Sequence, residues 1–204
     1  LSIGGMFPSH LQDRILLNLS QVPKDFQEML LIVEDKNFYN HRGISLKSIT
    51  RAFIRNTRAL GIEEGGSTIT QQLAKSLFFS PEQTIRRKIK EAIAALLIEI
   101  HYTKEEILLA YINDVFVAQA GRRAIHGFGL ASQFFFGTEL KNLTLDQKAL
   151  LVGMLKGPSF YSPTKNPERA RTRRDLVLTL VKNDSLISEE EYLELKEKPL
   201  KVIP

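Results

Sequence analysis

The sequence contains no cysteine, which excludes disulfide bonds and thiolate metal sites and suits either a reducing or an oxidising compartment. It also contains no uninterrupted apolar run near the roughly 18 residues that a transmembrane helix needs. No signal peptide opens the chain, and Leu1 is not a natural start. We therefore expect an excised domain whose membrane anchor, if it has one, lies upstream.

Internal repeats and low-complexity tracts are absent as well, so the 204 residues fit a single domain, residues 1–204. Hydrophobic residues make up 43% of the chain, which is enough to bury a substantial core. The formal net charge is +5 and the isoelectric point is near 9.4. This basic balance favours an anionic partner, which could be nucleic acid, a phosphate or an acidic membrane surface.

Apolar periodicity and capping signals predict an all-α chain. Pro23 suits a first helical position, and Ser80-Pro81 with Gln83 has the residues of a helix start with a capping box. Residues 92–98 are apolar on nearly every face, which predicts that their helix is the central buried one. The expected helices cover residues 24 to about 35, 45–61, 67–79, 80 to about 100, 103–113, 144–155 and 166–181, with a short acidic helix from 188.

The densest chemical signature is residues 34–43, EDKNFYNHRG, which begin where an apolar run ends. A carboxylate at the end of a buried helix can have its pKa raised by desolvation, which suits Glu34 for proton transfer near neutral pH. Phe38 can line such a site, His41 can hydrogen-bond across the turn, and Gly43 allows the chain to leave the turn with a positive φ. The alternative is an ordinary helix end with two solvated acids, Glu34 and Asp35, and a turn glycine.

Two further signatures follow. Residues 65–75, GGSTITQQLAK, are led by glycine and rich in hydroxyl and amide groups, and residues 87–91 read RKIKE. With Tyr111-Ile112-Asn113 and the RRDLVL run at 173–178, this order and spacing resembles the peptidoglycan glycosyltransferases, the family 51 glycosyltransferases. Members of that family polymerise lipid II in class A penicillin-binding proteins and in monofunctional relatives. The resemblance covers nearly the whole chain.

The resemblance implies a lysozyme-like, multi-helix single domain with a mobile, membrane-facing smaller lobe. It also implies an inverting reaction that builds β-1,4-linked glycan and releases undecaprenyl pyrophosphate. Glu34 matches the family's general base, which takes the proton from the 4-hydroxyl of the acceptor sugar. Asp35 matches the neighbouring acid, and Glu91 matches a second catalytic glutamate near the pyrophosphate or a bound cation. Inverting hydrolases likewise use two carboxylates held apart.

The departing pyrophosphate needs positive charge, because electrostatic stabilisation is usually the largest catalytic contribution. By resemblance, Lys75 matches the family's lysine, and Arg87 and Lys88 match its basic pair. Gln83, Arg87 and Glu91 fall on one row of a helix, although Arg87 and Glu91 could equally be a plain surface ion pair. Neutral donors and acceptors for phosphate and sugar would come from the second motif: Ser67, Thr68, Gln71 and Gln72.

The chain departs from the commonest family pattern at three places. Gln83 stands where arginine is usual, Leu109 where glutamate is common, and residues 116–118, FVA, replace tyrosine-x-glycine. Our hypothesis is that Arg86, a neighbour of Gln83 on the helix surface, supplies the missing charge near the pyrophosphate. Residues 118–137 look most like the bifunctional subgroup.

The expected partners follow from the resemblance: lipid II, the nascent glycan strand and an anionic membrane surface, with no nucleic acid. Inhibition by moenomycin-type phosphoglycolipids and a location on the outer face of the bacterial cytoplasmic membrane are implied too. No cofactor is expected to be required, and a magnesium or manganese ion would bridge through the pyrophosphate. The expected helix 45–61 carries a basic row that fits either a membrane surface or an ordinary solvated face: Lys47, Arg51, Arg55 and Arg58.

Two other classes of function compete with this reading. A lytic hydrolase of the lysozyme superfamily would share the fold and could work from a single glutamate, but it does not need the second glutamate and the basic cluster. A non-catalytic basic module would bind DNA with strong salt dependence. It does not explain why carboxylate motifs flank the glutamine-rich segment.

Overall fold

A computed structural model describes residues 14–45, 66–79, 84–121 and 123–203 of the chain. Helices dominate these segments, which confirms the predicted class. The elements are α1 Lys24–Glu34, α3 Ile69–Phe78, α4 Ile85–His101, α5 Lys104–Asp114, β1 Phe116–Ala120, β2 Arg123–His126, α6 Phe128–Phe136, α7 Leu145–Met154, α8 Pro167–Asn183 and α9 Glu189–Glu197. Short 3-10 turns lie at Leu19–Gln21, Phe38–Asn40 and Leu140–Asn142.

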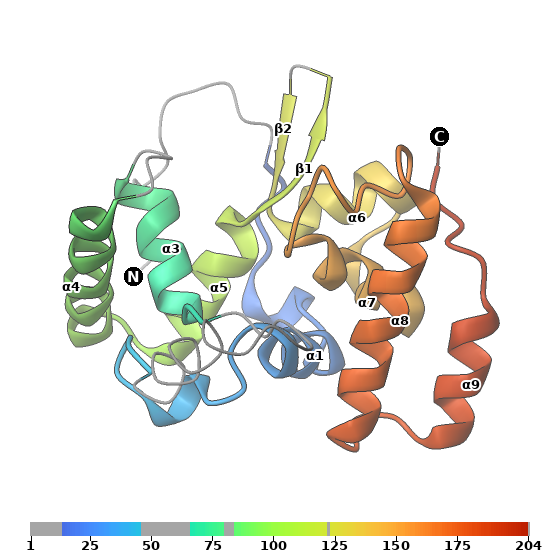
Figure 1. The fold of residues 1–204 in the computed structure, drawn as a ribbon, viewed down its shortest axis with the longest axis horizontal. Helices are drawn as coiled ribbons and strands as arrows, with labels where there is room; N and C mark the ends of the chain where they lie inside the picture. Colours follow the sequence, from blue (N-terminus) through green and yellow to red (C-terminus); the bar gives the residue numbers. More distant parts are fainter. Residues whose placement is uncertain (1–13, 46–65, 80–83, 122, 204) are drawn as a thin grey trace.

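Two groups of helices flank α1 (Figure 1). In one group α3 packs against α4 and α5, and in the other α7 packs against α8 and α9. Helix α1 packs against α7 and α8, and its Phe26 meets Phe128 of α6 edge to face at 4.8 Å. Glu34, the last residue of α1, is therefore held between the two groups.

Capping boxes start several helices where the sequence predicts them. Thr103 with Glu106, Thr144 with Gln147, and Ser188 with Glu191 each exchange the reciprocal bonds of this motif. Thr68 and Gln71 do the same at the start of α3. Pro23, predicted at a first helical position, is the N-cap of α1, and Lys24 is the first helical residue.

A two-stranded antiparallel hairpin, β1 with β2, interrupts the expected all-α chain. Its pairing is irregular between Phe116 and Ala118, and the adjacent Val117 and Ala118 are both buried. This bulge breaks the two-residue alternation by which a strand is recognised in sequence. Helix α6 was not predicted either. Its N-cap is Gly127, which has no side chain to cap the helix, so the sequence gives no capping signal at its start.

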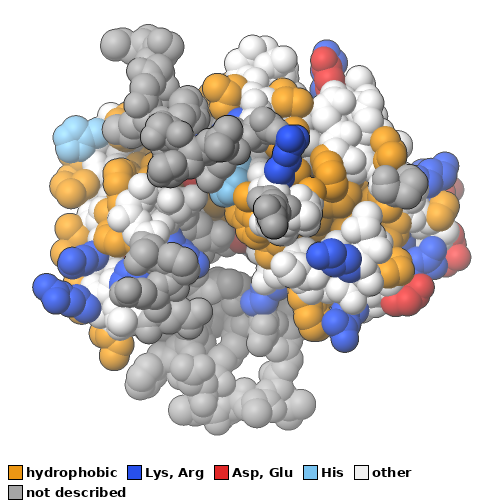
Figure 2. All heavy atoms as spheres, turned by 90° about the horizontal axis from the view of Figure 1, so that it is seen from above, with side chains coloured by type: hydrophobic (Ala, Val, Ile, Leu, Met, Phe, Trp, Pro, Cys, Tyr) orange, Lys and Arg blue, Asp and Glu red, His pale blue; other side chains and the backbone are white. Residues whose placement is uncertain are grey.

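Helix α4 differs from its prediction in position and in start. It lies at the outer edge of the molecule rather than at its centre (Figure 1), and buries Glu91, Ala95 and Ile98. Helix α4 carries more apolar surface than α3 and α5 cover, both within the run 92–98 and beside it, so part of this surface is exposed: Ile85, Ile89, Ile93, Leu96, Leu97 and Ile100. At the α4 end of the molecule, apolar and basic side chains lie side by side (Figure 2).

The cap of α4 is Thr84, whose hydroxyl accepts from the Arg87 backbone N–H at 3.2 Å. The helix therefore starts at Ile85 and not at the predicted residue 80, while the capping box predicted at Ser80-Pro81 and Gln83 lies outside the described residues. A hydroxyl residue four positions later supplies the cap instead. The predicted helix 45–61, with its basic row, lies outside the described residues.

Gly43 joins the first motif to α4 by a close backbone approach. Its φ is +78°, and a Cβ placed there would lie 2.8 Å from the Ala95 carbonyl oxygen. Its own carbonyl accepts a hydrogen bond from the Thr68 hydroxyl at 2.6 Å. The positive φ expected from the sequence is therefore confirmed.

We expect Gly43→Ala to destabilise the fold by more than the about 1–2 kcal/mol that a left-handed L residue costs, because the methyl group also meets backbone. Gly121→Ala is the matched control, since φ is +58° there and nothing lies within 4 Å of the added Cβ. Urea unfolding of both variants measures the difference. Equal losses would contradict the close approach at Ala95.

Candidate active site

Glu34 lies at the C-terminal end of α1, with part of its side chain open to solvent. Burial raises the pKa of Glu34 above its ordinary 4.5. A hydrogen bond from Gln72 and the positive charges of Arg173 and Lys156 oppose this rise, while the charge of Asp35 adds to it. The result is a reachable carboxylate with an increased proton affinity, which is what a general base requires.

Gln72 connects Glu34 to the opposite group of helices. Its side-chain Nε2 donates to Glu34 Oε2 at 2.9 Å, and its Oε1 accepts from the Tyr111 hydroxyl at 2.9 Å. The three side chains come from α1, α3 and α5. Gln72 was predicted to bind substrate, but the structure places it as a neighbour of the carboxylate itself.

Asp35 links the first motif to the second. Its carboxylate lies 2.9 and 3.0 Å from Nε2 of His41, and Oδ2 accepts from the backbone N–H of Ile69 at 3.0 Å. His41 thus bonds across the turn, as predicted. Asp35 was matched by resemblance to the acid beside the family's general base and was expected among the catalytic residues. Because both Asp35 oxygens contact protein donors, the geometry favours a role in positioning α3.

Phe38 and His41 form the base of this turn. Phe38 is almost fully buried and meets the His41 ring edge to face with centroids 6.2 Å apart. Lys104 Nζ lies over the Phe38 ring, 4.4 Å from its centroid. Phe38 therefore supports the turn that holds Asp35.

Thr68 and Gln71, predicted to contact substrate, use their side chains within the protein. Thr68 Oγ1 donates to Gly43 O and accepts from the Gln71 backbone, and Gln71 Oε1 accepts from the Thr68 backbone. Both residues are buried. They fix the start of α3, and so the position of Gln72.

Glu91 is fully buried and holds two cations of α4. Arg87 Nε lies 3.2 Å from Oε1, and Lys88 Nζ lies 3.0 Å from Oε2. Lys88 also donates to the Ser67 hydroxyl at 2.9 Å, which connects α4 to the start of the second motif. The alternative of a plain surface ion pair is wrong, because the carboxylate is inaccessible to solvent.

Another carboxylate on α4, that of Glu99, was not predicted, although its side chain is only 6% exposed. Its Oε1 accepts from the Thr70 hydroxyl at 2.6 Å and from Lys104 Nζ at 2.8 Å, and Lys104 also donates to the His41 carbonyl at 2.7 Å. The signal was present in the sequence, because Glu99 is a charged residue within an otherwise apolar stretch of α4. A charge at such a position is usually paired.

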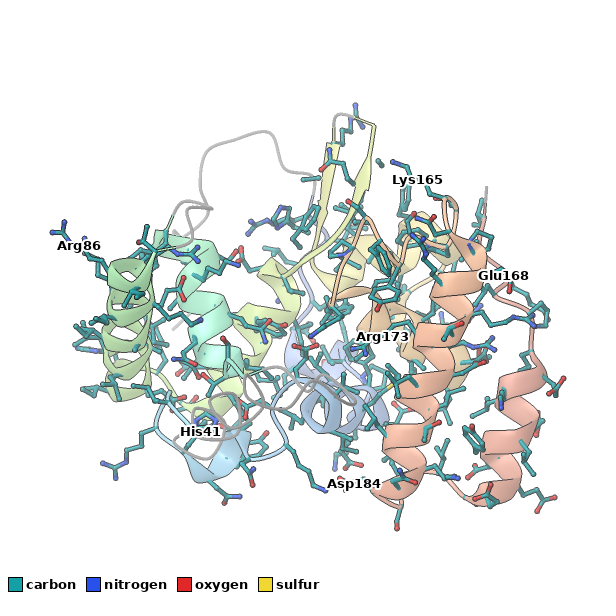
Figure 3. The ribbon with its side chains drawn as sticks, viewed as in Figure 1. His41, Arg86, Lys165, Glu168, Arg173 and Asp184 are labelled. Carbon is teal, nitrogen blue, oxygen red and sulfur yellow. The ribbon has the colours of Figure 1, made fainter. Side chains whose placement is uncertain are left out.

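Arg173 and Arg174 belong to a quoted motif, but no role was assigned to either. Arg173 lies on the side of α8 that faces α1 (Figure 3), with Nε donating to the Gly153 carbonyl at 3.2 Å. Arg174 is fully buried and donates to the carbonyls of Lys196 and Lys198, so it joins α8 to the end of α9. The arginine pair thus divides into one residue at the site and one in the core.

The remaining predicted cations differ in placement. Lys75 is exposed in the last turn of α3. Arg86 is exposed and points away from α3 (Figure 3). Gln83, its expected neighbour, lies outside the described residues, so the Arg86 hypothesis stays a prediction.

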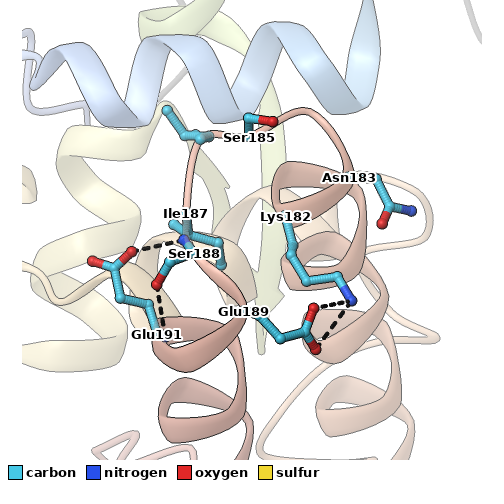
Figure 4. A pocket seen from close by; sticks show the side chains of 8 residues that line it. Lys182, Asn183, Ser185, Ile187, Ser188, Glu189 and Glu191 are labelled. Atoms are coloured by element: carbon cyan, nitrogen blue, oxygen red, sulfur yellow. Dashed lines mark hydrogen bonds and ion pairs between the residues drawn. The ribbon is translucent and has the colours of Figure 1, made fainter.

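No three His, Asp or Glu side chains of the described segments gather closely enough to hold a metal ion. A polar hollow at the turn between α8 and α9 contains none of the predicted site residues (Figure 4). Its charged groups are engaged locally, Lys182 with Glu189 at 3.0 Å and Glu191 with the Ser188 backbone at 2.8 Å. The carboxylate of Glu34 remains the best candidate centre for chemistry.

Known proteins match nearly the whole chain. A family model described as Transglycosylase matches residues 3–182. Penicillin-binding protein 1B of Vibrio cholerae is 48% identical over 191 residues, which are 94% of this chain and 25% of that protein. Penicillin-binding protein 1B of Escherichia coli is 45% identical over 193 residues, which are 95% of this chain and 23% of that protein.

The crystal structure of penicillin-binding protein 1A from Haemophilus influenzae matches with a TM-score of 0.57 and 23% identity. The match covers 94% of this chain and 18% of that one, and it is a likeness of fold alone. The present chain spans about a quarter of the length of the curated relatives that it matches.

Proposed function

The chain belongs to the transglycosylase family, and on this premise we propose that it is the peptidoglycan glycosyltransferase domain of a class A penicillin-binding protein. The reaction joins lipid II units into β-1,4-linked glycan and releases undecaprenyl pyrophosphate. The observation that carries the proposal is the Glu34 carboxylate, which is open to solvent in part and has a pKa raised by burial.

Glu34 acts as the general base. The hydrogen bond from Gln72 occupies Oε2. No described residue donates to Oε1, so we assign this oxygen to accept the proton of the acceptor's 4-hydroxyl. As the 4-hydroxyl oxygen of the acceptor attacks the anomeric carbon of the donor sugar, the bond from that carbon to the pyrophosphate breaks on the opposite face. The configuration therefore inverts, and no covalent glycosyl-enzyme forms. Arg173 and Lys156 help to keep Glu34 ionised before the reaction.

The leaving pyrophosphate is stabilised by Lys75, Arg87 and Lys88. Glu91 holds two of these cations at 3.2 and 3.0 Å and so acts through them. The described residues offer no metal cluster of their own. We propose that a magnesium or manganese ion, where one takes part, is bound through the pyrophosphate oxygens. We also propose that phosphoglycolipids of the moenomycin type compete with the pyrophosphate for Lys75, Arg87 and Lys88.

The proposal is tested by incubating the domain with lipid II in detergent and analysing the products for glycan polymer. Polymer from the wild type, but not from Glu34→Gln, is the expected result. Release of soluble muropeptides from purified sacculi, without polymer from lipid II, would support the lytic hydrolase instead. Strongly salt-dependent DNA binding without either product would support the non-catalytic module.

We further propose that the α4 face rests on an anionic bilayer at the outer surface of the bacterial cytoplasmic membrane. The exposed fractions of Ile85, Ile89 and Ile93 are 83%, 58% and 53%, and these residues repeat at one-turn spacing. Arg86 and Lys90 lie beside them on the exposed surface. Exposed apolar side chains with basic neighbours are typical of an interfacial helix. Within the described segments no helix is both long and apolar enough to cross a membrane.

Replacing Ile85, Ile89 and Ile93 together with glutamine should sharply weaken sedimentation of the domain with vesicles containing anionic lipid, because buried apolar area drives interfacial binding. The melting temperature should change little, since these side chains are exposed. Leu193→Gln on α9, where the side chain is 57% exposed, is the control and should bind as the wild type does. Undiminished binding of the triple variant would refute this orientation.

A further inference from the structure

Tyr111 is a buried tyrosine whose hydroxyl points toward the site without reaching Glu34 directly. The residue is 2% exposed and comes from α5, on the far side of Gln72 from Glu34. Within the described part of the chain, its hydroxyl makes a single hydrogen bond, at 2.9 Å to Gln72 Oε1. A buried hydroxyl without this acceptor would be costly.

The direction of each hydrogen bond in this chain follows from the chemistry of the groups. An ionised carboxylate can only accept, so Gln72 must turn its NH₂ group toward Glu34. The amide oxygen then faces Tyr111, which must donate. If the amide turned over, an oxygen would face the carboxylate and the buried Tyr111 hydrogen would lose its acceptor.

We propose that Tyr111 is a positioning residue for the general base, and that it acts through Gln72 by holding the amide with its donor toward Glu34. The inference rests on the proposed function, in which Glu34 accepts the proton of the attacking hydroxyl. Tyr111 touches neither the sugar nor the carboxylate, so its effect passes through one amide group.

The surroundings allow this role. Burial and the charges of Glu34 and Asp35 raise the pKa of Tyr111 well above 10, so its hydroxyl remains a donor throughout the working range. Among the described residues, the polar and charged groups that face Glu34 are Gln72 from α3, Arg173 from α8, Lys156 after α7 and the adjacent Asp35. Of these, Gln72 is the neutral one, and it can reverse its polarity by turning over.

Tyr111→Phe removes the hydroxyl and keeps the ring. The Gln72 amide is then free to turn its oxygen toward Glu34 when Glu34 is protonated, and this stabilises the protonated carboxyl. Glu34 therefore loses its proton at higher pH, and the acid limb of the kcat profile should move to higher pH. Near the limb kcat should fall about tenfold, the size expected for one hydrogen bond to a charged group. KM for lipid II should stay near the wild-type value, since the hydroxyl does not contact substrate.

The deciding experiment is a double-variant cycle of Tyr111→Phe and Gln72→Ala, with lipid II polymerisation measured across pH. If Tyr111 acts through Gln72, Tyr111→Phe should have no further effect when Gln72 is already alanine. Additive losses, or a Tyr111→Phe profile superimposable on the wild type, would overturn the proposal. Melting curves of each variant separate these outcomes from a general loss of folding.

A measurement without substrate keeps this inference separate from the proposed function. Carbon NMR of protein labelled at the glutamate carboxyls, assigned with Glu34→Gln, reports the Glu34 titration directly. Tyr111→Phe should shift this titration upward even if the wild type polymerises nothing, in which case only the proposed function fails. If Tyr111→Phe does not fold, a fluorinated tyrosine at position 111 is a stronger donor and should shift the titration downward. No shift in the folded variant would overturn the role of Tyr111.

Discussion

Replacing Glu34 with glutamine should lower the rate of lipid II polymerisation by about 10²–10⁴-fold, the usual contribution of a positioned general base. The amide has the same size and can still meet the Gln72 side chain, but it cannot take the proton of the attacking hydroxyl. Binding of lipid II and the helical fold should therefore persist. Initial rates on lipid II, with binding measured separately, test this expectation.

The same substitution should stabilise the folded domain at neutral pH. Since the pKa of Glu34 is raised in the folded state, the ionised carboxylate costs folding free energy. That cost is absent below the ordinary pKa of 4.5, grows as the pH rises through the raised pKa of the folded state, and is complete above it. The melting temperature of Glu34→Gln should thus exceed that of the wild type at pH 7, and the two should converge in acid.

Glu28→Gln is the matched control, because Glu28 is an exposed glutamate on the same helix. It should change neither the polymerisation rate nor the pH dependence of melting. A Glu34→Gln variant that polymerises at nearly the wild-type rate would remove Glu34 from the mechanism. A variant less stable than the wild type at pH 7 would contradict a carboxylate that burial disfavours.

Local signals in the sequence predicted the parts of the fold that local chemistry determines. Capping boxes such as that of Thr103 fixed helix starts, and the positive φ of Gly43 was expected from its place after the first motif. The burial of α4 could not be predicted in this way. An apolar run states what a helix can bury, whereas the area that α3 and α5 actually cover depends on tertiary packing.

The site shows the same division. The motifs identified Glu34 and Glu91, but not the path from Glu34 through Gln72 to Tyr111, because these residues meet only when α1, α3 and α5 pack together. Conversely, hydroxyl and amide groups in the second motif suggested substrate contacts, yet Thr68 and Gln71 are used to cap α3. Composition indicates which polar groups are available, and only the fold shows which are already satisfied.

Glu91→Gln should reduce both stability and turnover. The Glu91 carboxylate is 0% exposed and pairs with Arg87, whose side chain is 14% exposed, and with Lys88. A neutral amide leaves the two cations without this charge between them. The loss of stability comes mainly from Arg87, because breaking a buried pair costs about 3 kcal/mol or more, whereas the Lys88 side chain is 52% exposed and stays solvated. Because Arg87 and Lys88 would then repel and lose their fixed positions, polymerisation should fall strongly even at temperatures where the variant is folded.

Urea unfolding and steady-state rates on lipid II separate the two effects. Glu194→Gln is the control, since Glu194 pairs with Lys198 at the same one-turn spacing as Arg87 and Glu91 but with its side chain 70% exposed. Solvent screens such a pair, so neither stability nor rate should change measurably. If Glu91→Gln lowers stability while the folded fraction retains full turnover, Glu91 is a structural residue and the cations of α4 do not depend on it for their action at the pyrophosphate.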